Sequence, residues 1–211
     1  FESSRVEVTG TPVRSEFGNL PSETEARKGF GLHPDRPVVL CFGGSQGAKG
    51  LNTLVAGAAE CLGTAVQWLH VAGRQDVERV KELVGDREGH VVCGFCDDMP
   101  AAYAASTLVI SRSGGASLTE LASLGLPSIL VPYPYAADDH QTFNARCFEE
   151  AGASLLVPES VLRPASLAEM VGGLLADPAK LEAMGRAAET LCPGDAVKRI
   201  CDSLESMEKA S

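Results

Sequence analysis

The chain has 211 residues, of which 45% are hydrophobic, and a formal net charge of −10 at pH 7. This length and composition suffice for one domain with a full core, and no apolar run approaches the roughly 18 residues of a membrane span. The negative charge argues against binding nucleic acid or an anionic bilayer through electrostatics. No signal peptide is visible, and the chain begins at Phe1, which fits a sequence whose upstream part is missing.

The first 36 residues read as a connector. Residues 5–14 (RVEVTGTPVR) alternate like a strand and then turn at Gly10–Pro12, and a short helix is expected around Ser22–Gly29. Arg14 is the one residue here with a candidate function. A lone arginine on a linker is usually solvated, so this candidate needs support from elsewhere in the chain.

Short apolar runs alternate with helical patterns over the rest of the chain. We expect strands at Pro37–Phe42, Val66–Val71, His90–Phe95, Thr107–Ile110, Ser128–Pro132 and Ala153–Val157. Three final helices are expected over roughly Pro164–Ala176, Ala179–Thr190 and Asp195–Lys209. Five or six strands that alternate with helices predict an α/β fold with a Rossmann-like, doubly wound parallel sheet, and such folds bind ligands at the carboxyl ends of their strands.

The polar and glycine-rich segments fall at those carboxyl ends. They are Gly43–Gly47, Cys96–Asp98, Ser113–Glu120 and Ala136–Gln141. The first matches neither the Walker pattern nor G-x-G-x-x-G, so it is no standard nucleotide fingerprint. Two glycine-rich strand-to-helix turns in one parallel sheet nevertheless open onto the same crevice. The residues therefore predict a domain that binds a phosphate-bearing, hydroxyl-rich ligand such as a nucleotide or nucleotide sugar.

The segment Ser111–Glu120 (SRSGGASLTE) carries the sharpest of these predictions. A strand that passes through a glycine corner into a helix leaves unpaired N–H groups and the positive end of the helix dipole facing outward, where phosphate binds well. Glu120 is expected in the first helical turn, where its carboxylate can accept two ribose hydroxyls. Alternatively, Ser117-x-x-Glu120 is a capping box, which needs no ligand. Spacing alone does not decide between the two.

Two further candidates have structural alternatives. His70 lies near a strand end and could point into the crevice, but we expect a structural histidine. Asp97 and Asp98 suggest an acidic metal-binding pair, but an Asp followed by Met-Pro is an ordinary helix N-cap, which we favour. The exposed backbone of this loop could instead read a flat base edge.

His140 and Gln141 follow a predicted strand and have hydrogen-bonding groups suited to a sugar, and His140 could also do acid–base chemistry. The alternative is a capped helix start with Asp138 or Asp139 as the N-cap. The helix that follows is expected to carry Phe143, Cys147 and Phe148 on one face.

Seven cysteines are scattered along the chain. Cys93 and Cys96 form a lone Cys-x-x-Cys pair after His90, and no second pair is spaced to complete a zinc site. Cys41 and Cys93 fall within apolar runs, where a thiol acts as a small hydrophobic group. We therefore expect free thiols, a reducing compartment and no metal site.

Four motifs in order resemble the MurG family, the bacterial peptidoglycan enzymes that move N-acetylglucosamine from UDP-GlcNAc to lipid I. The motifs are Gly43–Ala48 (GGSQGA), Phe95–Met99 (FCDDM), Arg112–Glu120 (RSGGASLTE) and Asp139–Ala145 (DHQTFNA). In addition, Thr9–Arg14 (TGTPVR) resembles the family's linker between its two domains. The chain departs from the family at Thr11, where Asn is frequent, and at Cys96, which replaces an aliphatic residue.

The resemblance covers nearly the whole chain and implies one half of a GT-B fold. Residues 1–36 would be an interdomain linker remnant with a short helix, and residues 37–211 the nucleotide-sugar (donor) binding domain with its C-terminal helices. Arg14 and the backbone at Cys96 would hold uracil, and Ser45 would lie at the diphosphate. Glu120 would accept the ribose hydroxyls, and Gln141, together with His140, would bind the sugar. The remaining contacts would be backbone N–H groups directed at phosphate, from Gly115, Ala116, Ser117, Leu118 and Thr119.

The implied chemistry is an inverting displacement, in which a hydroxyl of lipid I attacks the anomeric carbon while UDP leaves, with no metal or cofactor. In this family the acceptor site, the base and the membrane-facing surface belong to the N-terminal half. We therefore expect this chain to bind UDP-GlcNAc without transferring sugar, and the full-length enzyme to be cytoplasmic and peripheral to the inner face of the plasma membrane. The alternatives are a donor-binding subunit of a split glycosyltransferase with a membrane-anchored partner, or a GT-B nucleotide-sugar epimerase.

Overall fold

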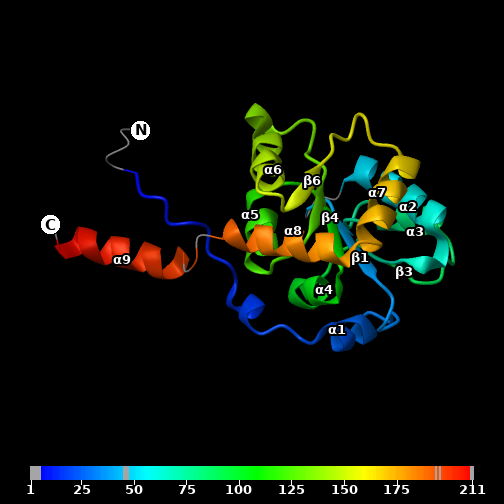
Figure 1. Ribbon diagram of the computed structural model, residues 1–211, viewed down its shortest axis with the longest axis horizontal. Helices are drawn as coiled ribbons and strands as arrows, with labels where there is room; N and C mark the ends of the chain where they lie inside the picture. Colours follow the sequence, from blue (N-terminus) through cyan, green and yellow to red (C-terminus); the bar gives the residue numbers. More distant parts are fainter. Residues whose placement is uncertain (1–5, 45–47, 193, 195, 210–211) are drawn as a thin grey trace.

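A computed structural model describes residues 6–44, 48–192, 194 and 196–209. Its six strands form one sheet in the order β3-β2-β1-β4-β5-β6 (Figure 1), and every neighbouring pair is parallel. The strands are β1 (Val38–Phe42), β2 (Gln67–Val71), β3 (His90–Cys93), β4 (Leu108–Ser111), β5 (Ser128–Leu130) and β6 (Ser154–Leu156). The predicted Rossmann-like, doubly wound parallel sheet is confirmed.

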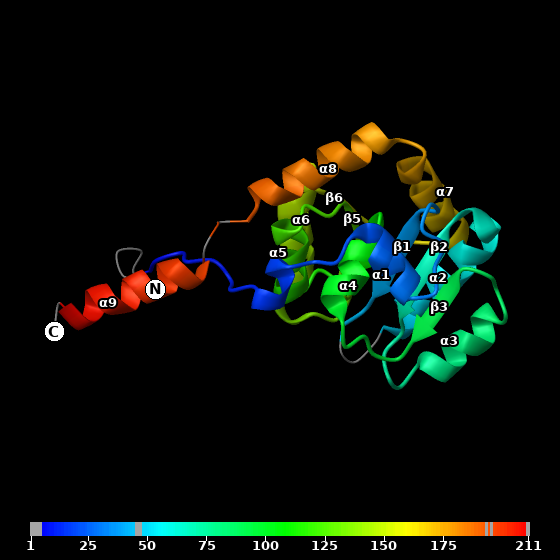
Figure 2. The ribbon, with the colours of Figure 1, turned by 90° about the horizontal axis from the view of Figure 1, so that it is seen from below.

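Helices cover both faces of the sheet (Figure 2). One face packs against α2 (Lys49–Leu62), α3 (Val77–Val84) and α7 (Pro164–Leu175). The other packs against α4 (Met99–Ala105), α5 (Gly115–Ser123) and α6 (His140–Glu150), and α1 (Glu23–Gly29) packs on α4. Helix α8 (Pro178–Thr190) adds buried residues to both layers. Successive residues of a strand point to opposite faces, so Leu40 joins one core cluster and Cys41 the other.

The helix predicted around residues 22–29 is confirmed, and it is fixed to the domain by a buried arginine. Ser22 caps α1 in a capping box with Glu25. Arg27 is only 5% exposed and donates hydrogen bonds to Pro34 O (2.7 Å), Thr107 Oγ1 (2.8 Å) and Ala105 O (3.0 Å). These bonds join α1 to the end of α4, to the turn that leads into β4, and to the loop before β1.

The strand predicted for residues 5–14 is wrong over the described part, because residues 6–14 form neither helix nor strand. An alternating pattern favours extended backbone, but a strand also needs a neighbour to accept its hydrogen bonds. This segment instead runs beside α9 (Ala196–Lys209), which projects away from the sheet (Figures 1 and 2). Ser203 Oγ donates to Glu7 Oε2 at 2.8 Å.

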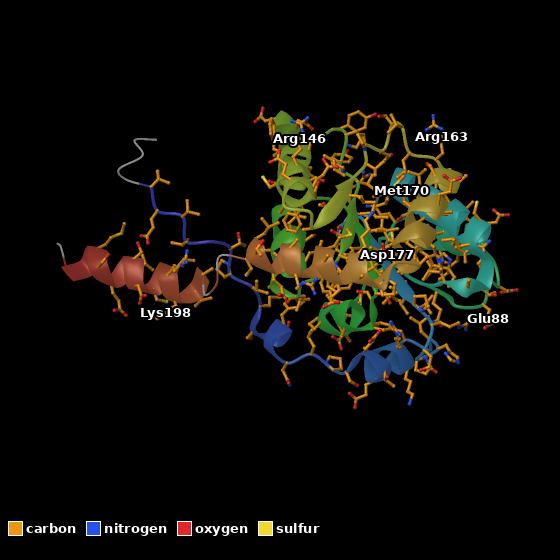
Figure 3. The ribbon with its side chains drawn as sticks, in the orientation of Figure 1. Glu88, Arg146, Arg163, Met170, Asp177 and Lys198 are labelled. Carbon is orange, nitrogen blue, oxygen red and sulfur yellow. The ribbon has the colours of Figure 1, made fainter. Side chains whose placement is uncertain are left out.

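Glu88, Arg163 and Lys198 are charged side chains on the outside of the helices and loops (Figure 3). Glu88 pairs with Arg36 at 2.9 Å, and both side chains meet solvent. Such exposed pairs contribute about 0–1 kcal/mol, so the two buried layers hold the fold together. Among the described residues no helix is both long enough and apolar enough to span a membrane.

Candidate functional site

The candidate site lies where β1 and β4 meet in the middle of the sheet. These strands are hydrogen-bonded neighbours, with Phe42 opposite Ser111 at their carboxyl ends. After β1 the chain enters α2 on one face, whereas after β4 it enters α5 on the other. The crevice at such a switch point is where doubly wound folds bind ligands. Both glycine-rich turns open here, as expected from the sequence.

Close packing requires glycine in the turn after β1. A Cβ on Gly43 would lie 2.3 Å from Ala48 Cβ, closer than any real contact, and Gly44 has a φ of +89°. A bare backbone therefore faces the crevice at this point. Ser45, the predicted diphosphate contact, lies outside the described residues.

No side chain caps the N-terminus of α5, where Gly114 is the N-cap residue. The N–H of Leu118 donates to Gly114 O at 3.0 Å and is thus used by the helix itself. The donors left over at this helix end are those of Gly115, Ala116 and Ser117. Leu118 is buried in the core instead, and Thr119 Oγ1 turns back to Gly115 O at 2.9 Å.

Glu120 is the sixth residue of α5, so it lies in the second helical turn. The prediction that placed it in the first turn is wrong. Because Gly114 is the N-cap, the capping box at Ser117 and Glu120 is also wrong. The carboxylate has another partner: Tyr103 Oη donates to Glu120 Oε2 at 2.8 Å. The helix-capping alternative for this carboxylate is thereby removed.

Arg14 and Cys96, predicted to act together, line the same pocket of about 230 Å³ beside Phe42, Gly44 and Phe95. The Arg14 guanidinium lies 5.0 Å from the centroid of the Phe17 ring. Cys96 is buried, and burial followed by the neighbouring Cys93 raises the pKa of its thiol to about 11. The thiol is therefore neutral at physiological pH.

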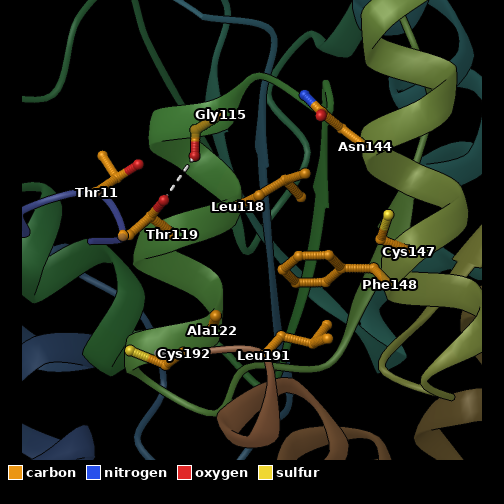
Figure 4. A pocket seen from close by; sticks show the side chains of 11 residues that line it. Thr11, Gly115, Leu118, Thr119, Ala122, Asn144, Cys147, Phe148, Leu191 and Cys192 are labelled. Atoms are coloured by element: carbon orange, nitrogen blue, oxygen red, sulfur yellow. Dashed lines mark hydrogen bonds between the residues drawn. The ribbon is translucent and has the colours of Figure 1, made fainter. Parts of the chain in front are cut away.

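A second cavity, of about 280 Å³, lies between α5 and α6 (Figure 4). Gly115, Thr119 and Thr11 contribute to one side of it, and Leu118 and Phe148 supply apolar surface. Ligand pockets usually measure roughly 300–1,000 Å³. Each cavity therefore suits one part of a nucleotide sugar rather than the whole.

His140 and Gln141 begin α6, directly after a strained loop. Asp138 and Asp139 have left-handed backbones with φ of 51° and 53°, and such strain is concentrated at functional sites. His140 Nδ1 lies 2.7 Å from Ala137 O, so this nitrogen carries the proton. Gln141 Oε1 accepts from Tyr133 N–H at 3.0 Å, which holds the side-chain amide in place.

The helix-cap alternative holds only in part here. Asp139 is the N-cap residue of α6 but makes no capping bond to the backbone; its Oδ1 accepts from Thr142 Oγ1 at 2.6 Å. The shared face predicted for α6 is wrong, because Phe143 is 58% exposed whereas Phe148 is buried.

The structural alternatives for Asp98 and His70 are confirmed. Asp98 Oδ1 accepts the N–H of Ala101 at 2.9 Å, which makes Asp98 a helix N-cap. His70 is fully buried and bonds His90 and Asn52. All seven cysteines are free. Within the described ranges no group of three or more His, Cys, Asp or Glu side chains is arranged to hold a metal ion.

Sequence reasoning missed two residues that hold the site together. One is Tyr103, the partner of Glu120; as a lone aromatic among alanines (MPAAYAA) it offered a weak signal. The other is Asn144, whose Nδ2 donates to Ser113 O at 3.1 Å. Since Ser113 Oγ in turn donates to Gln141 O at 2.7 Å, the loops after β4 and β5 are locked to each other.

The fold and the crevice define a Rossmann-like α/β domain with its candidate site at the β1–β4 switch point. Residues 38–200 match the family model described as the glycosyltransferase family 28 C-terminal domain, and the chain belongs to this family.

Curated relatives carry the name UDP-N-acetylglucosamine–N-acetylmuramyl-(pentapeptide) pyrophosphoryl-undecaprenol N-acetylglucosamine transferase. The protein of Synechococcus elongatus is 38% identical over 96% of this chain and 56% of its own length. The protein of Listeria monocytogenes is 37% identical over 99% of this chain and 58% of its own length. The chain thus spans somewhat more than half the length of these relatives.

A similar solved structure is that of MurG from Acinetobacter baumannii, with a TM-score of 0.77 and 28% identity. It aligns with 93% of this chain and 57% of the MurG chain. The resemblance to the MurG family seen in the sequence motifs is therefore confirmed.

Proposed function

We propose that this chain is the UDP-GlcNAc-binding C-terminal domain of a MurG-like inverting glycosyltransferase, which transfers N-acetylglucosamine to lipid I. The observation that carries the proposal is that three features lie around the carboxyl end of β1: an uncapped helix N-terminus after the neighbouring strand β4, a carboxylate held by a tyrosine, and a pocket beside Arg14. Phosphate, ribose and base each have a suitable partner within one crevice. The names of the relatives supply the identity of the sugar.

The donor parts are assigned as follows. Uracil lies in the pocket of Arg14 and Cys96, where the Cys96 contact is through backbone. Glu120 accepts the ribose hydroxyls, and the diphosphate binds the N–H groups that begin α5, with Ser45 beside it. Gln141 binds sugar hydroxyls together with His140.

The helix end also favours the chemistry. As the bond to the anomeric carbon breaks, negative charge develops on the leaving UDP, and free N–H groups aligned with the positive end of the α5 dipole stabilise it. This stabilisation requires no metal ion. No residue of this chain is assigned as the base that deprotonates the acceptor hydroxyl.

Residues 37–211 are proposed as the donor-binding domain and residues 1–36 as the interdomain linker with α1. The acceptor site and the membrane-facing surface would lie in an N-terminal domain, with the full-length enzyme at the cytoplasmic face of the membrane. On this basis the chain alone binds the donor but transfers no sugar. A measurable transfer rate from the purified 211-residue chain would contradict this division of labour.

Calorimetric titration with UDP-GlcNAc in the presence of EDTA tests the proposal. The chain is expected to bind the donor without metal, and Glu120→Ala to weaken binding by roughly tenfold or more, because a hydrogen bond to a charged group contributes about 1.5–3 kcal/mol. The matched control is Glu169→Ala, which removes an exposed carboxylate from α7 on the other face of the sheet. Donor binding unchanged by Glu120→Ala would exclude the ribose role, and no binding to wild type would refute the proposal.

A further inference from the structure

Tyr103 occupies an unusual position for a residue with no assigned role. It projects from α4, is 1% exposed, and packs between Phe17 and Phe42, with ring centroids 5.8 Å and 5.9 Å away. Its hydroxyl leaves this apolar layer and donates to Glu120 Oε2 on α5. A buried tyrosine hydroxyl requires a partner, and here that partner is the one carboxylate assigned to the ligand.

The bond restricts Glu120 without neutralising it. A free glutamate side chain samples many rotamers, and ordering it on ligand binding costs conformational entropy. Tyr103 fixes one oxygen, while the remaining lone pairs of the carboxylate stay available as acceptors. An arginine or lysine in the same place would cancel the charge and compete with the ligand hydroxyls.

The Tyr103 hydroxyl remains a hydrogen-bond donor because it does not lose its proton. Burial, followed by the negative charge of Glu120, raises the pKa of the Tyr103 hydroxyl far above its usual value. The phenol therefore keeps its proton at neutral pH, and Glu120 Oε2 faces a hydrogen-bond donor.

Tyr103 links the ribose side of the crevice to the base side as well. Phe17, against which its ring packs, is the residue whose ring lies under the Arg14 guanidinium. Phe42, its second neighbour, is the last residue of β1 and lines the pocket of Arg14 and Cys96. Tyr103 thus touches the supports of both subsites.

We propose that Tyr103 is a positioning residue for ribose recognition, whose buried hydroxyl holds the Glu120 carboxylate ready to accept the vicinal hydroxyls of the nucleotide. The inference rests on the proposed function, since it takes Glu120 to be the ribose acceptor. Its consequence is selectivity: the contribution of Tyr103 is realised only with a ligand that carries ribose hydroxyls.

The test compares UDP with 2′,3′-dideoxyuridine diphosphate, titrated to millimolar concentration against the full 211-residue chain. Tyr103→Phe deletes a single oxygen and keeps both ring contacts. It is expected to weaken UDP binding by roughly fivefold, the value of one ordinary hydrogen bond, and to leave the binding of the dideoxy nucleotide unchanged. Tyr135→Phe is the matched control, because it removes the hydroxyl of an 82% exposed tyrosine and should alter neither affinity.

A double-mutant cycle shows whether Tyr103 acts through Glu120. If it does, Tyr103→Phe has no further effect on UDP affinity in a Glu120→Ala background. Glu120→Asp is a second variant that tests the same point, since it keeps the charge but shortens the side chain by one methylene. With Tyr103 intact, this variant should bind UDP more weakly and the dideoxy nucleotide as well as wild type does.

The outcomes separate this inference from the proposed function. An equal loss for both nucleotides on Tyr103→Phe, or additive losses in the cycle, would overturn the positioning role alone and make Tyr103 a packing residue. Wild-type protein that binds neither nucleotide, or binds both equally, would overturn the ribose assignment of Glu120 and the inference with it.

Discussion

His70 and His90 form a buried pair whose tautomers, when both rings are neutral, follow from their hydrogen bonds. The amide nitrogen of Asn52 donates to Ala72 O (2.8 Å) and to Asp76 Oδ2 (2.7 Å), so Asn52 Oδ1 is left as an acceptor. His70 Nε2, at 3.1 Å from this oxygen, must then carry its proton. In a neutral His70, Nδ1 accepts, and His90 Nε2 donates to it at 3.3 Å. The network is therefore satisfied by two neutral rings, each with its proton on Nε2.

Protonating either ring costs stability. Burial lowers the pKa of His70 to about 4 against the opposing charge of Asp76, and burial with repulsion from His70 and Arg87 lowers the pKa of His90 to about 3. The unfolded chain has histidine pKa values near 6.5, so it binds more protons than the folded chain between about pH 6.5 and pH 4. The free energy of unfolding therefore falls as the pH is lowered through this window. At about 1.4 kcal/mol per pH unit, His70 alone accounts for about 3 kcal/mol.

Urea denaturation at pH 7.5 and pH 5 measures this dependence. Each of the two histidines contributes about 2 kcal/mol between these pH values, so wild type should lose about 4 kcal/mol more than the double variant His70→Gln/His90→Gln, which has no imidazole at either position. Carboxylates titrate equally in both proteins, so the difference isolates the histidines. Equal slopes for wild type and the double variant would refute the reasoning.

Three further substitutions test the scaffold. Arg27→Met should lower the free energy of unfolding by about 3 kcal/mol, because three acceptors lose their donor. A loss below about 1 kcal/mol in urea denaturation would show that water replaces the guanidinium as the donor. Asp98→Ala should cost about 1 kcal/mol through loss of the α4 cap, and Asp98→Asn should restore most of it. Gly43→Ala should displace the turn after β1 and weaken UDP-GlcNAc binding in calorimetry by roughly tenfold, whereas Gly18→Ala, with no atom within 4 Å, should bind normally.

The sheet was predictable because its signals are local. All five residues of β1 are buried, and a short, apolar, β-branched run in an α/β sequence is typical of a parallel strand covered on both faces. The cap at Asp98 and the bare turn at Gly43 likewise follow from residue types that suit one backbone geometry. The positions of both glycine-rich turns at one crevice then follow from parallel strands alone.

The errors arise where a local pattern was compatible with two structures. Ser117 and Glu120 have the spacing of a capping box, but α5 begins at Gly115, so Ser117 is already inside the helix. Residues 6–14 alternate like a strand but have no strand beside them. The bond between Tyr103 and Glu120 joins two helices, and no periodicity within either helix predicts that their side chains meet.

The contacts that orient the candidate ligand groups share one physical property. The bonds from Tyr103 to Glu120 and from Ser113 to Gln141 measure 2.8 Å and 2.7 Å, are only partly buried, and join separate elements at the rim of the sheet. A group at the rim that loses its partner can turn to water, so each such bond contributes only about 1 kcal/mol to stability. The same loss frees a carboxylate or a loop that must be ordered again when ligand binds. Tyr103→Phe and Ser113→Ala, which remove only the hydroxyls, should therefore change affinity before they change the midpoint of unfolding, whereas Arg27→Met should do the reverse.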